Sequence, residues 1–170
     1  MKKLILILTM LTVLSATNPK ENQEFDWKKI IYKDLATIER YGLVYVHLQG
    51  SAKDIGLDQD ELSDYMKLKY KNNFSTVPYN KDENLILLGM NIDEQKKVGI
   101  MHINIWTVGD DYPVAYHIEI FSGPFYDESI YNNAVLGYDA ADNIEKIVKE
   151  TITKMIEELA ITYFKIREEI

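Results

Sequence analysis

Two histidines and a glutamate lie in neighbouring apolar segments, and these residue types can ligate metals or move protons. His102 lies in segment 98–107, whereas His117 and Glu119 lie in segment 114–121. Imidazole and carboxylate groups bind divalent metals of the zinc type, and a histidine beside a carboxylate can act as a general base. Metal binding or hydrolysis is therefore the chemistry to expect if the fold brings the three side chains together.

Both segments alternate in polarity with a period of two residues, which predicts β-strands that bury one face. One face is mainly aliphatic and is the predicted core side: Met101, Ile103, Ile105, Val114, Tyr116, Ile118 and Ile120. The other face is polar and aromatic: His102, Asn104, Trp106, Ala115, His117, Glu119 and Phe121. Helices should cover the aliphatic face, so any binding is expected on the second face.

The turn between these segments decides which residues meet across the strands. Gly109-Asp110 predicts a two-residue hairpin that pairs Val108 with Asp111. That register keeps aliphatic residues opposite one another and places His102 opposite His117, within contact range.

An earlier segment, 43–48, is rich in β-branched and aromatic residues and predicts another strand. It places Tyr45 and His47 on one face, so all three histidines of the chain can share the polar face. The candidate binding residues are then Tyr45, His47, His102, Asn104, Trp106, His117, Glu119 and Phe121. A binding surface and a metal or catalytic site both remain open interpretations of this face.

Helical periodicity predicts three helices. The first covers 26–39. The second follows Asp58, whose carboxylate is suited to cap it, and runs to about Asn72. The third begins after Asp139, and its apolar stripe continues over about 27 residues, or roughly 40 Å.

Two more strands are expected, over 85–92 and 130–136, and Gly123-Pro124 is expected to end the strand before it. The predicted fold class is α+β. It is a two-layer sandwich with a mostly antiparallel sheet of about four strands, helices on one face and a long C-terminal helix.

The N-terminus has the pattern of an export signal. Two lysines precede an apolar run over 4–14, and small residues follow. We expect residues 1–16 to be a signal peptide cleaved after Ala16, with cleavage after Ser15 as the alternative. The run is shorter than the roughly 20 residues that span a bilayer, which disfavours an uncleaved anchor.

After the leader, a flexible segment is expected over 17–25 and a single domain over 26–170. The protein is expected in the periplasm or secreted, with membrane contact only through the leader before cleavage.

Composition argues against several functional classes. There are 19 lysines plus arginines against 27 acidic residues, a net charge of −8, so nucleic acid is an unfavourable partner. The chain has no cysteine, hence no disulfide, thiol nucleophile or cysteine metal site. The sequence signatures of zinc peptidases, serine hydrolases and phosphate-binding loops are also missing, so no cofactor is expected.

A strand over Leu43–Leu48 is followed by the helix start Gly56–Leu62 with Leu68, a meander and the final apolar stripe. This order over about residues 40–168 resembles small exported bacterial proteins of unassigned function. It is more distantly similar to small α/β domains of envelope assembly proteins, such as the N-terminal domain of TolB or the core of curli-secretion lipoproteins. The chain lacks their propeller and their lipidated cysteine. The resemblance implies a fold and a compartment, and it carries over no catalytic residue.

The leading hypothesis is a non-enzymatic exported protein that binds or assembles with an envelope protein through the polar face or an edge strand. One alternative is a metal-binding protein or hydrolytic enzyme that uses His102, His117 and Glu119. The other is a carrier that holds a small ligand between the long helix and the sheet.

Overall fold

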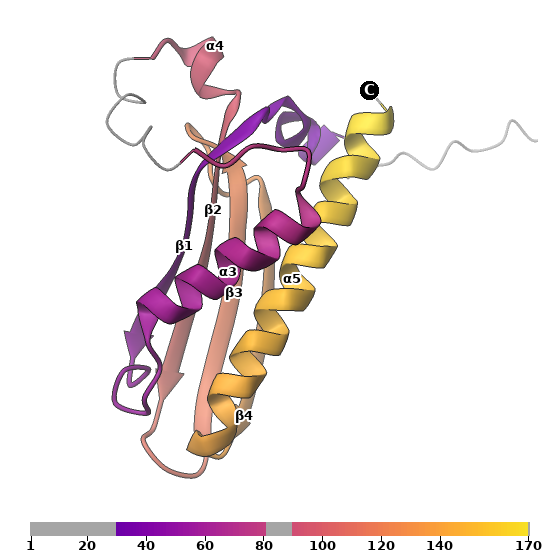
Figure 1. Ribbon diagram of the computed structural model, residues 1–170. Helices are drawn as coiled ribbons and strands as arrows, with labels where there is room; N and C mark the ends of the chain where they lie inside the picture. The colour runs from indigo at the N-terminus through magenta and orange to yellow at the C-terminus, as the bar shows by residue number, and fades with distance from the viewer. Residues whose placement is uncertain (1–29, 81–89, 170) are drawn as a thin grey trace, which may run out of the picture.

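Four strands form one sheet in the order β1-β2-β3-β4 in this computed structural model, which describes residues 30–80 and 90–169 (Figure 1). The strands are β1 (Arg40–Gly50), β2 (Val98–Val108), β3 (Val114–Pro124) and β4 (Tyr131–Asp139). β1 and β2 run parallel, and the other two pairs are antiparallel. The predicted α+β class with a mostly antiparallel sheet is confirmed.

Two helices, α3 (Gln59–Asn73) and α5 (Ala141–Glu169), lie side by side against one face of the sheet (Figure 1). A short 3-10 helix, η1 (Lys33–Thr37), and the one-turn helix α4 (Ile92–Gln95) lie near one end of the strands. No helix in the described part of the chain is both long and apolar enough to cross a membrane.

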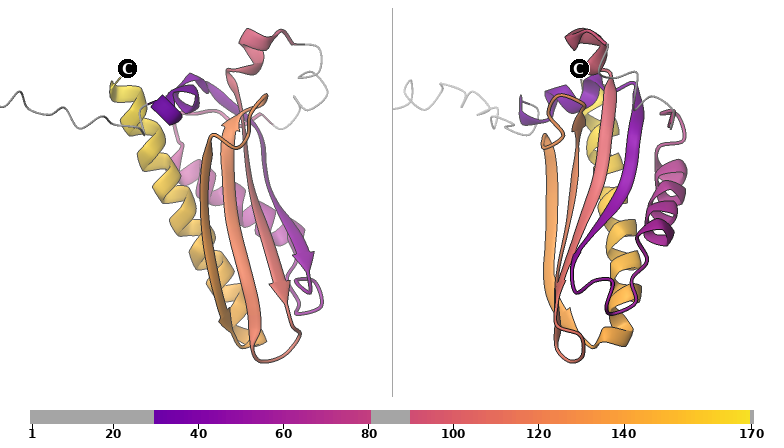
Figure 2. Two further views of the ribbon diagram at one scale, coloured as in Figure 1. Left: turned by 180° about the vertical axis from the view of Figure 1, so that it is seen from behind. Right: turned by 90° about the vertical axis from the view of Figure 1, so that its left-hand side faces the viewer.

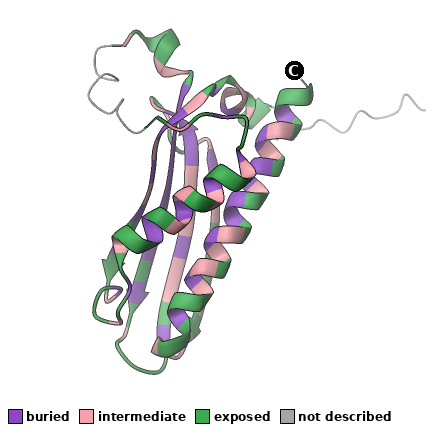
Figure 3. Cartoon of the chain, viewed as in Figure 1, coloured by how far each residue is buried: buried purple, intermediate pink, exposed green. Residues whose placement is uncertain are grey.

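The core lies between the helical layer and the aliphatic face of the sheet (Figure 3). The sheet contributes alternate residues that are fully buried, among them Met101, Ile103, Ile105, Ile118 and Ile120. α5 contributes the predicted stripe: Ile144, Val148, Ile152, Met155, Ile156, Leu159 and Tyr163. Burying each such aliphatic side chain stabilises the fold by about 1.5–3 kcal/mol. Because α5 and the strands form one continuous buried cluster, the ligand-carrier hypothesis gains no support here.

The start of α3 is the predicted one. The Asp58 carboxylate accepts hydrogen bonds from the backbone N–H groups of Asp60 and Glu61 at 2.8 and 2.9 Å. α3 also closes the outer edge of β1. Ser63 Oγ accepts from the Val46 N–H at 3.0 Å, and Gln59 Oε1 accepts from the Leu48 N–H at 3.2 Å.

The predicted register of the β2–β3 hairpin is wrong. Val108 pairs with Ala115, so Phe121 lies opposite His102, four positions beyond the expected His117 (117 to 121). The predicted register would have placed Pro113 inside the ladder, where it has no N–H to donate, so pairing with β2 begins beyond it. The shift is an even number of residues, and the assignment of side chains to faces therefore survives.

Other differences are local. β3 continues through Gly123 to Pro124, because the chain stays paired with Gly99 at the far end of β2. β4 extends to Asp139, beyond the expected limit of 136.

Several expected elements lie partly or wholly outside the described residues. Ile92 begins a helix instead of ending a strand, because the Asn91 side chain caps the turn, and 85–89 lie outside the described residues. Of the predicted helix 26–39, the described part contains the short helical turn at 30–31 and η1. The predicted leader 1–16 and segment 17–25 also lie outside the described residues.

Replacing Ser63 by alanine tests how the β1 edge is held. Ser63→Ala leaves the buried Val46 N–H without its acceptor, which should lower the free energy of unfolding by about 1–3 kcal/mol. Urea unfolding measures the change. Ser75→Ala, at an exposed serine, is the matched control and should change stability by less than about 0.5 kcal/mol. Equal effects of the two changes would contradict this account.

Candidate functional site

The face of the sheet opposite the helices has no described helix over it, as the rear view in Figure 2 shows. We call this the open face. Its side chains form rows across the strands: Tyr45–His102–Phe121–Asn132, His47–Asn104–Glu119–Ala134 and Gln49–Trp106–His117–Leu136. All the candidate residues predicted from the sequence lie in these rows. Whether they bind anything stays a prediction.

His102 is closed off by its neighbours in the first row. Its ring stacks on Tyr45 at a centroid distance of 5.4 Å and on Phe121 at 4.9 Å. Only 7% of the residue is exposed, and Nδ1 has no hydrogen-bond partner among the described residues. The Glu128 carboxylate lies 3.6 Å from Nδ1, beyond normal hydrogen-bond length.

Burial of His102 lowers its pKa below the usual 6.5, because the charged imidazolium loses its hydration. The carboxylates of Glu128 and Glu119 act in the opposite direction, and His47 adds slightly to the lowering. The side chain is therefore neutral near pH 7 and serves as the middle ring of an aromatic stack.

The structure does not bring the predicted metal ligands together. His117 lies opposite Trp106, four residues along β2 from His102, or roughly 13 Å at about 3.3 Å per residue. Glu119 instead accepts a hydrogen bond from Asn132 Nδ2 at 2.6 Å. Within 30–80 and 90–169, no group of three or more histidine or acidic side chains is arranged to hold a metal. The predicted contact between His102 and His117 is wrong for the register reason given above.

The open face is different at the hairpin end, where it is apolar and exposed. Trp106, Val108, Ala115, Tyr116, His117 and Leu136 line a hollow of about 230 Å³. Trp106 is 53% exposed and Leu136 is 79% exposed. Tyr138, also exposed, is paired with Ala115 beside the hollow. We call Trp106, Val108, Ala115, Leu136 and Tyr138 the hairpin patch.

Gly50 positions the Trp106 indole. It ends β1 with φ 65°, a conformation that glycine adopts readily. A Cβ at this position would come within 2.5 Å of Trp106 Cδ1, so the ring lies directly on the glycine backbone. The indole is thus supported from one side and open to solvent on the other.

Sequence reasoning missed Val108, Leu136 and Tyr138 as members of the patch. Leu136 and Tyr138 are two residues apart on β4, so their shared face was available from the alternation. Their position beside His117 and Ala115 depends on the β3–β4 register, which no local signal specified.

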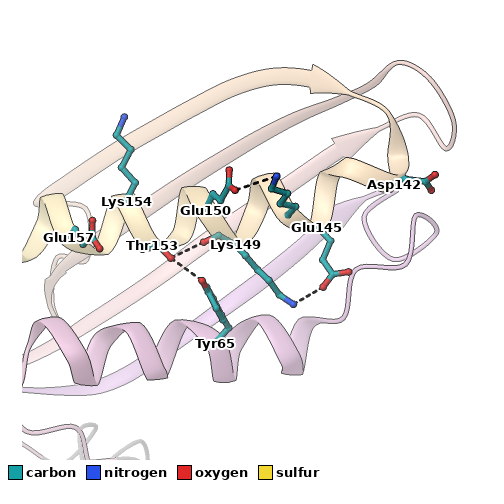
Figure 4. Close-up of a pocket in the computed structure, with 9 residues that line it drawn as sticks. Tyr65, Asp142, Glu145, Lys149, Glu150, Thr153, Lys154 and Glu157 are labelled. Carbon is teal, nitrogen blue, oxygen red and sulfur yellow. Dashed lines mark hydrogen bonds and ion pairs between the residues drawn. The ribbon is translucent and has the colours of Figure 1, made fainter.

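A second hollow lies between α3 and α5 and is lined mainly by charged side chains (Figure 4). Tyr65 reaches from α3 to Thr153 of α5, with 3.0 Å between their hydroxyl oxygens. Lys149 bonds Glu145 at 2.6 Å and Glu61 at 2.7 Å. Exposed pairs of this kind contribute about 0.2–1 kcal/mol and are typical of a solvated helix surface. This groove is therefore explained by helix packing alone.

No protein-family model matches the chain, and no curated protein matches it. Among solved structures it is similar to two PelC dodecamers from Paraburkholderia phytofirmans, in space groups C2 and P6. Both have a TM-score of 0.46, with sequence identities of 7% and 8%. The matches cover 72% and 73% of this chain, and 90% and 89% of the respective PelC chains.

The lowered pKa of His102 predicts that the free energy of unfolding depends on pH. The unfolded chain takes up a proton at His102 more readily than the folded chain, so this site destabilises the fold as the pH falls below 6.5. Well above pH 6.5 the imidazole is neutral in both the folded and the unfolded chain, so His102 causes no such loss of stability. His102→Phe keeps an aromatic ring and removes the titration. Its free energy of unfolding should fall less than that of the wild type between about pH 7.5 and about pH 5.

Titration of His102 by NMR checks the cause directly. Glu128→Gln removes the carboxylate that raises this pKa, so the pKa should fall further. Glu157→Gln, on the exposed side of α5, is the control and should leave it unchanged. A His102 pKa above 6.5 in the wild type would contradict this account, because the carboxylates of Glu128 and Glu119 would then outweigh the effect of burial.

Proposed function

We propose that this chain is an exported, non-enzymatic binding protein that engages a protein partner through the hairpin patch. The observation that carries the proposal is the exposure of Trp106, Val108, Leu136 and Tyr138 side by side on a sheet face without a described helix over it. Contiguous exposed apolar side chains of this kind mark interaction sites in soluble proteins.

The composition of the patch indicates the chemistry of its partner. Tryptophan and tyrosine supply large contact areas at low entropic cost and are enriched among residues that dominate binding energy. Polar side chains of Gln49 and His117 lie in the same row as Trp106 and Leu136, and the next row begins with His47 and Asn104, as in the polar rim of an interface. The expected partner is therefore a protein surface that presents apolar side chains.

Charge plays a small part in this proposal. The patch has no charged side chain, although the whole chain carries a net charge of −8. Binding is accordingly driven by burial of apolar surface and should change little with ionic strength, since screening acts on charges. The basic N-terminal residues and apolar run, together with the resemblance to exported proteins, support a partner in the envelope or the medium.

Site-specific photo-crosslinking in the native host tests the proposal. A photoreactive residue at position 115 lies inside the patch, whereas one at position 161 lies on α5, where Ile161 is 68% exposed. We expect one partner adduct from position 115 that persists at high salt, and none from position 161. An adduct with a second copy of this chain is recognised by its mass and does not count as support.

A second substitution in the probe-bearing chain identifies the anchor. Trp106→Ala should weaken the partner adduct from position 115 by about tenfold or more, because truncating an anchor residue costs about 2 kcal/mol. Leu68→Ala, at a leucine on α3 that is exposed to the same extent, is the matched control and should have no effect. Equal adducts from positions 115 and 161, or none from either, would overturn the proposed function.

A further inference from the structure

β4 is an edge strand, and no other described strand pairs with its outer side. The strand pairs with β3 over all nine residues of Tyr131–Asp139 without a break in register. Beyond that ladder, no backbone hydrogen bond joins β4 to any other residue in the described part of the chain. The side chains of Asn132 and Asn133 bond Glu119 and Glu158, so neither of these side chains caps the outer backbone groups of the strand.

The other edge of the sheet, at β1, is covered at both of its halves. Ser63 and Gln59 of α3 accept its outward N–H groups, as described above. Nearer its start, the Tyr41 N–H donates to the Pro78 carbonyl at 2.9 Å, and the Tyr41 carbonyl accepts from the Asn80 N–H at 3.0 Å. Other segments therefore bond to the outer side of β1, whereas no described segment bonds to the outer backbone of β4.

β4 also lacks the devices that keep edge strands apart. Natural edges are protected by lysine, proline, bulges or a covering segment. β4 has no lysine, arginine, proline or bulge, and its only charged residue is Asp139 at its end. Its centre, Ala134–Leu136, is apolar and exposed. Such an edge is suited to pair with another strand.

We propose that β4 pairs antiparallel with β4 of a second copy about a two-fold axis at Val135, which joins two four-stranded sheets into one. This register is the one that pairs all nine residues, because positions 131 and 139 then lie opposite each other. A two-fold contact uses the same surface on both copies and closes after two subunits. The proposal uses the β4 edge and goes beyond the function proposed for the hairpin patch.

The sequence of β4 is complementary to itself in this register. Large residues meet small ones: Leu136 lies opposite Ala134 and Tyr138 lies opposite Asn132 of the second copy. Asp139 lies opposite Tyr131, so no like charges meet across the pair. At the axis, the alanine and leucine side chains of both copies form an apolar group on the open face.

The pairing also has a geometric consequence. A two-fold axis perpendicular to the sheet keeps both helical layers on one side and both open faces on the other. Two hairpin patches then share one continuous face, and Leu136 belongs both to the patch and to the new contact. The dimer would present two equivalent sites to a partner.

The absence of cysteine allows a clean test by disulfide trapping. In Val135→Cys, the two sulfurs face each other, because directly opposite Cα atoms are about 4.5–5.5 Å apart and disulfides span about 4.4–6.8 Å. We expect nearly complete covalent dimer under mild oxidation. Ile161→Cys, at an exposed position on α5, is the control and should form no covalent dimer.

Two further variants test the register. Ala134→Cys and Leu136→Cys should cross-link poorly alone and readily when mixed, because these positions face each other across the axis. Dimers of Leu136→Cys that form faster than those of Val135→Cys would overturn the register. Cross-linking of Val135→Cys no faster than that of Ile161→Cys would overturn the pairing itself.

Native mass spectrometry of the uncross-linked protein completes the test. The wild type should be dimeric, Val135→Lys and Val135→Glu should each be monomeric, and their mixture should form the mixed dimer through the opposite charges. Circular dichroism shows that each variant is folded. A monomeric wild type overturns this inference and leaves the position-115 adduct of the proposed function unaffected, so the two failures are distinguishable.

Discussion

The structure depends on burial of the aliphatic face of the sheet beneath α5 and α3. Strand alternation separates aliphatic from polar and aromatic side chains, and α5 supplies a buried stripe from Ile144 to Ile166 to cover the aliphatic face. The Tyr163 hydroxyl donates to the Ile38 carbonyl at 2.6 Å, which ties the helix to the chain just before β1. Because both helices lie on one face, no described helix covers the side chains of the opposite face (Figure 2).

On the open face, side chains near His102 are buried, whereas those at the hairpin end are exposed. His102 lies between two aromatic rings and is almost fully buried, whereas Trp106, four residues further along β2, is exposed to solvent. The sheet edges repeat this asymmetry, since α3 closes β1 and no described residue closes β4. The exposed apolar surface and the free edge meet at Leu136. One corner of the molecule therefore carries both the exposed apolar side chains and the unpaired strand edge on which the two proposals rest.

Local patterns in the sequence were sufficient for the faces and for most elements. The two-residue alternation around His102 and His117 predicted which side chains share a face, and Asp58 predicted the start of α3. The register was not predictable, because Gly109-Asp110 suggested a tight turn while Pro113 prevents pairing there. The β1–β2 pair is parallel, and α3 lies in the long connection that such a pair needs, but no local signal specified which strand would be the partner of β1. The patch was recognised only in part, since Leu136 reaches it through strand order.

We propose above all that the hairpin end of the open face binds a protein partner. Hydroxyl-radical footprinting of the protein, in extract of its native host and after purification, tests this proposal most directly. Trp106 should be strongly oxidised in the purified protein and protected in the extract, while the equally exposed Leu68 on α3 reacts alike in both. Equal oxidation of Trp106 in the two samples, or a Trp106 that is already unreactive after purification, would contradict the account.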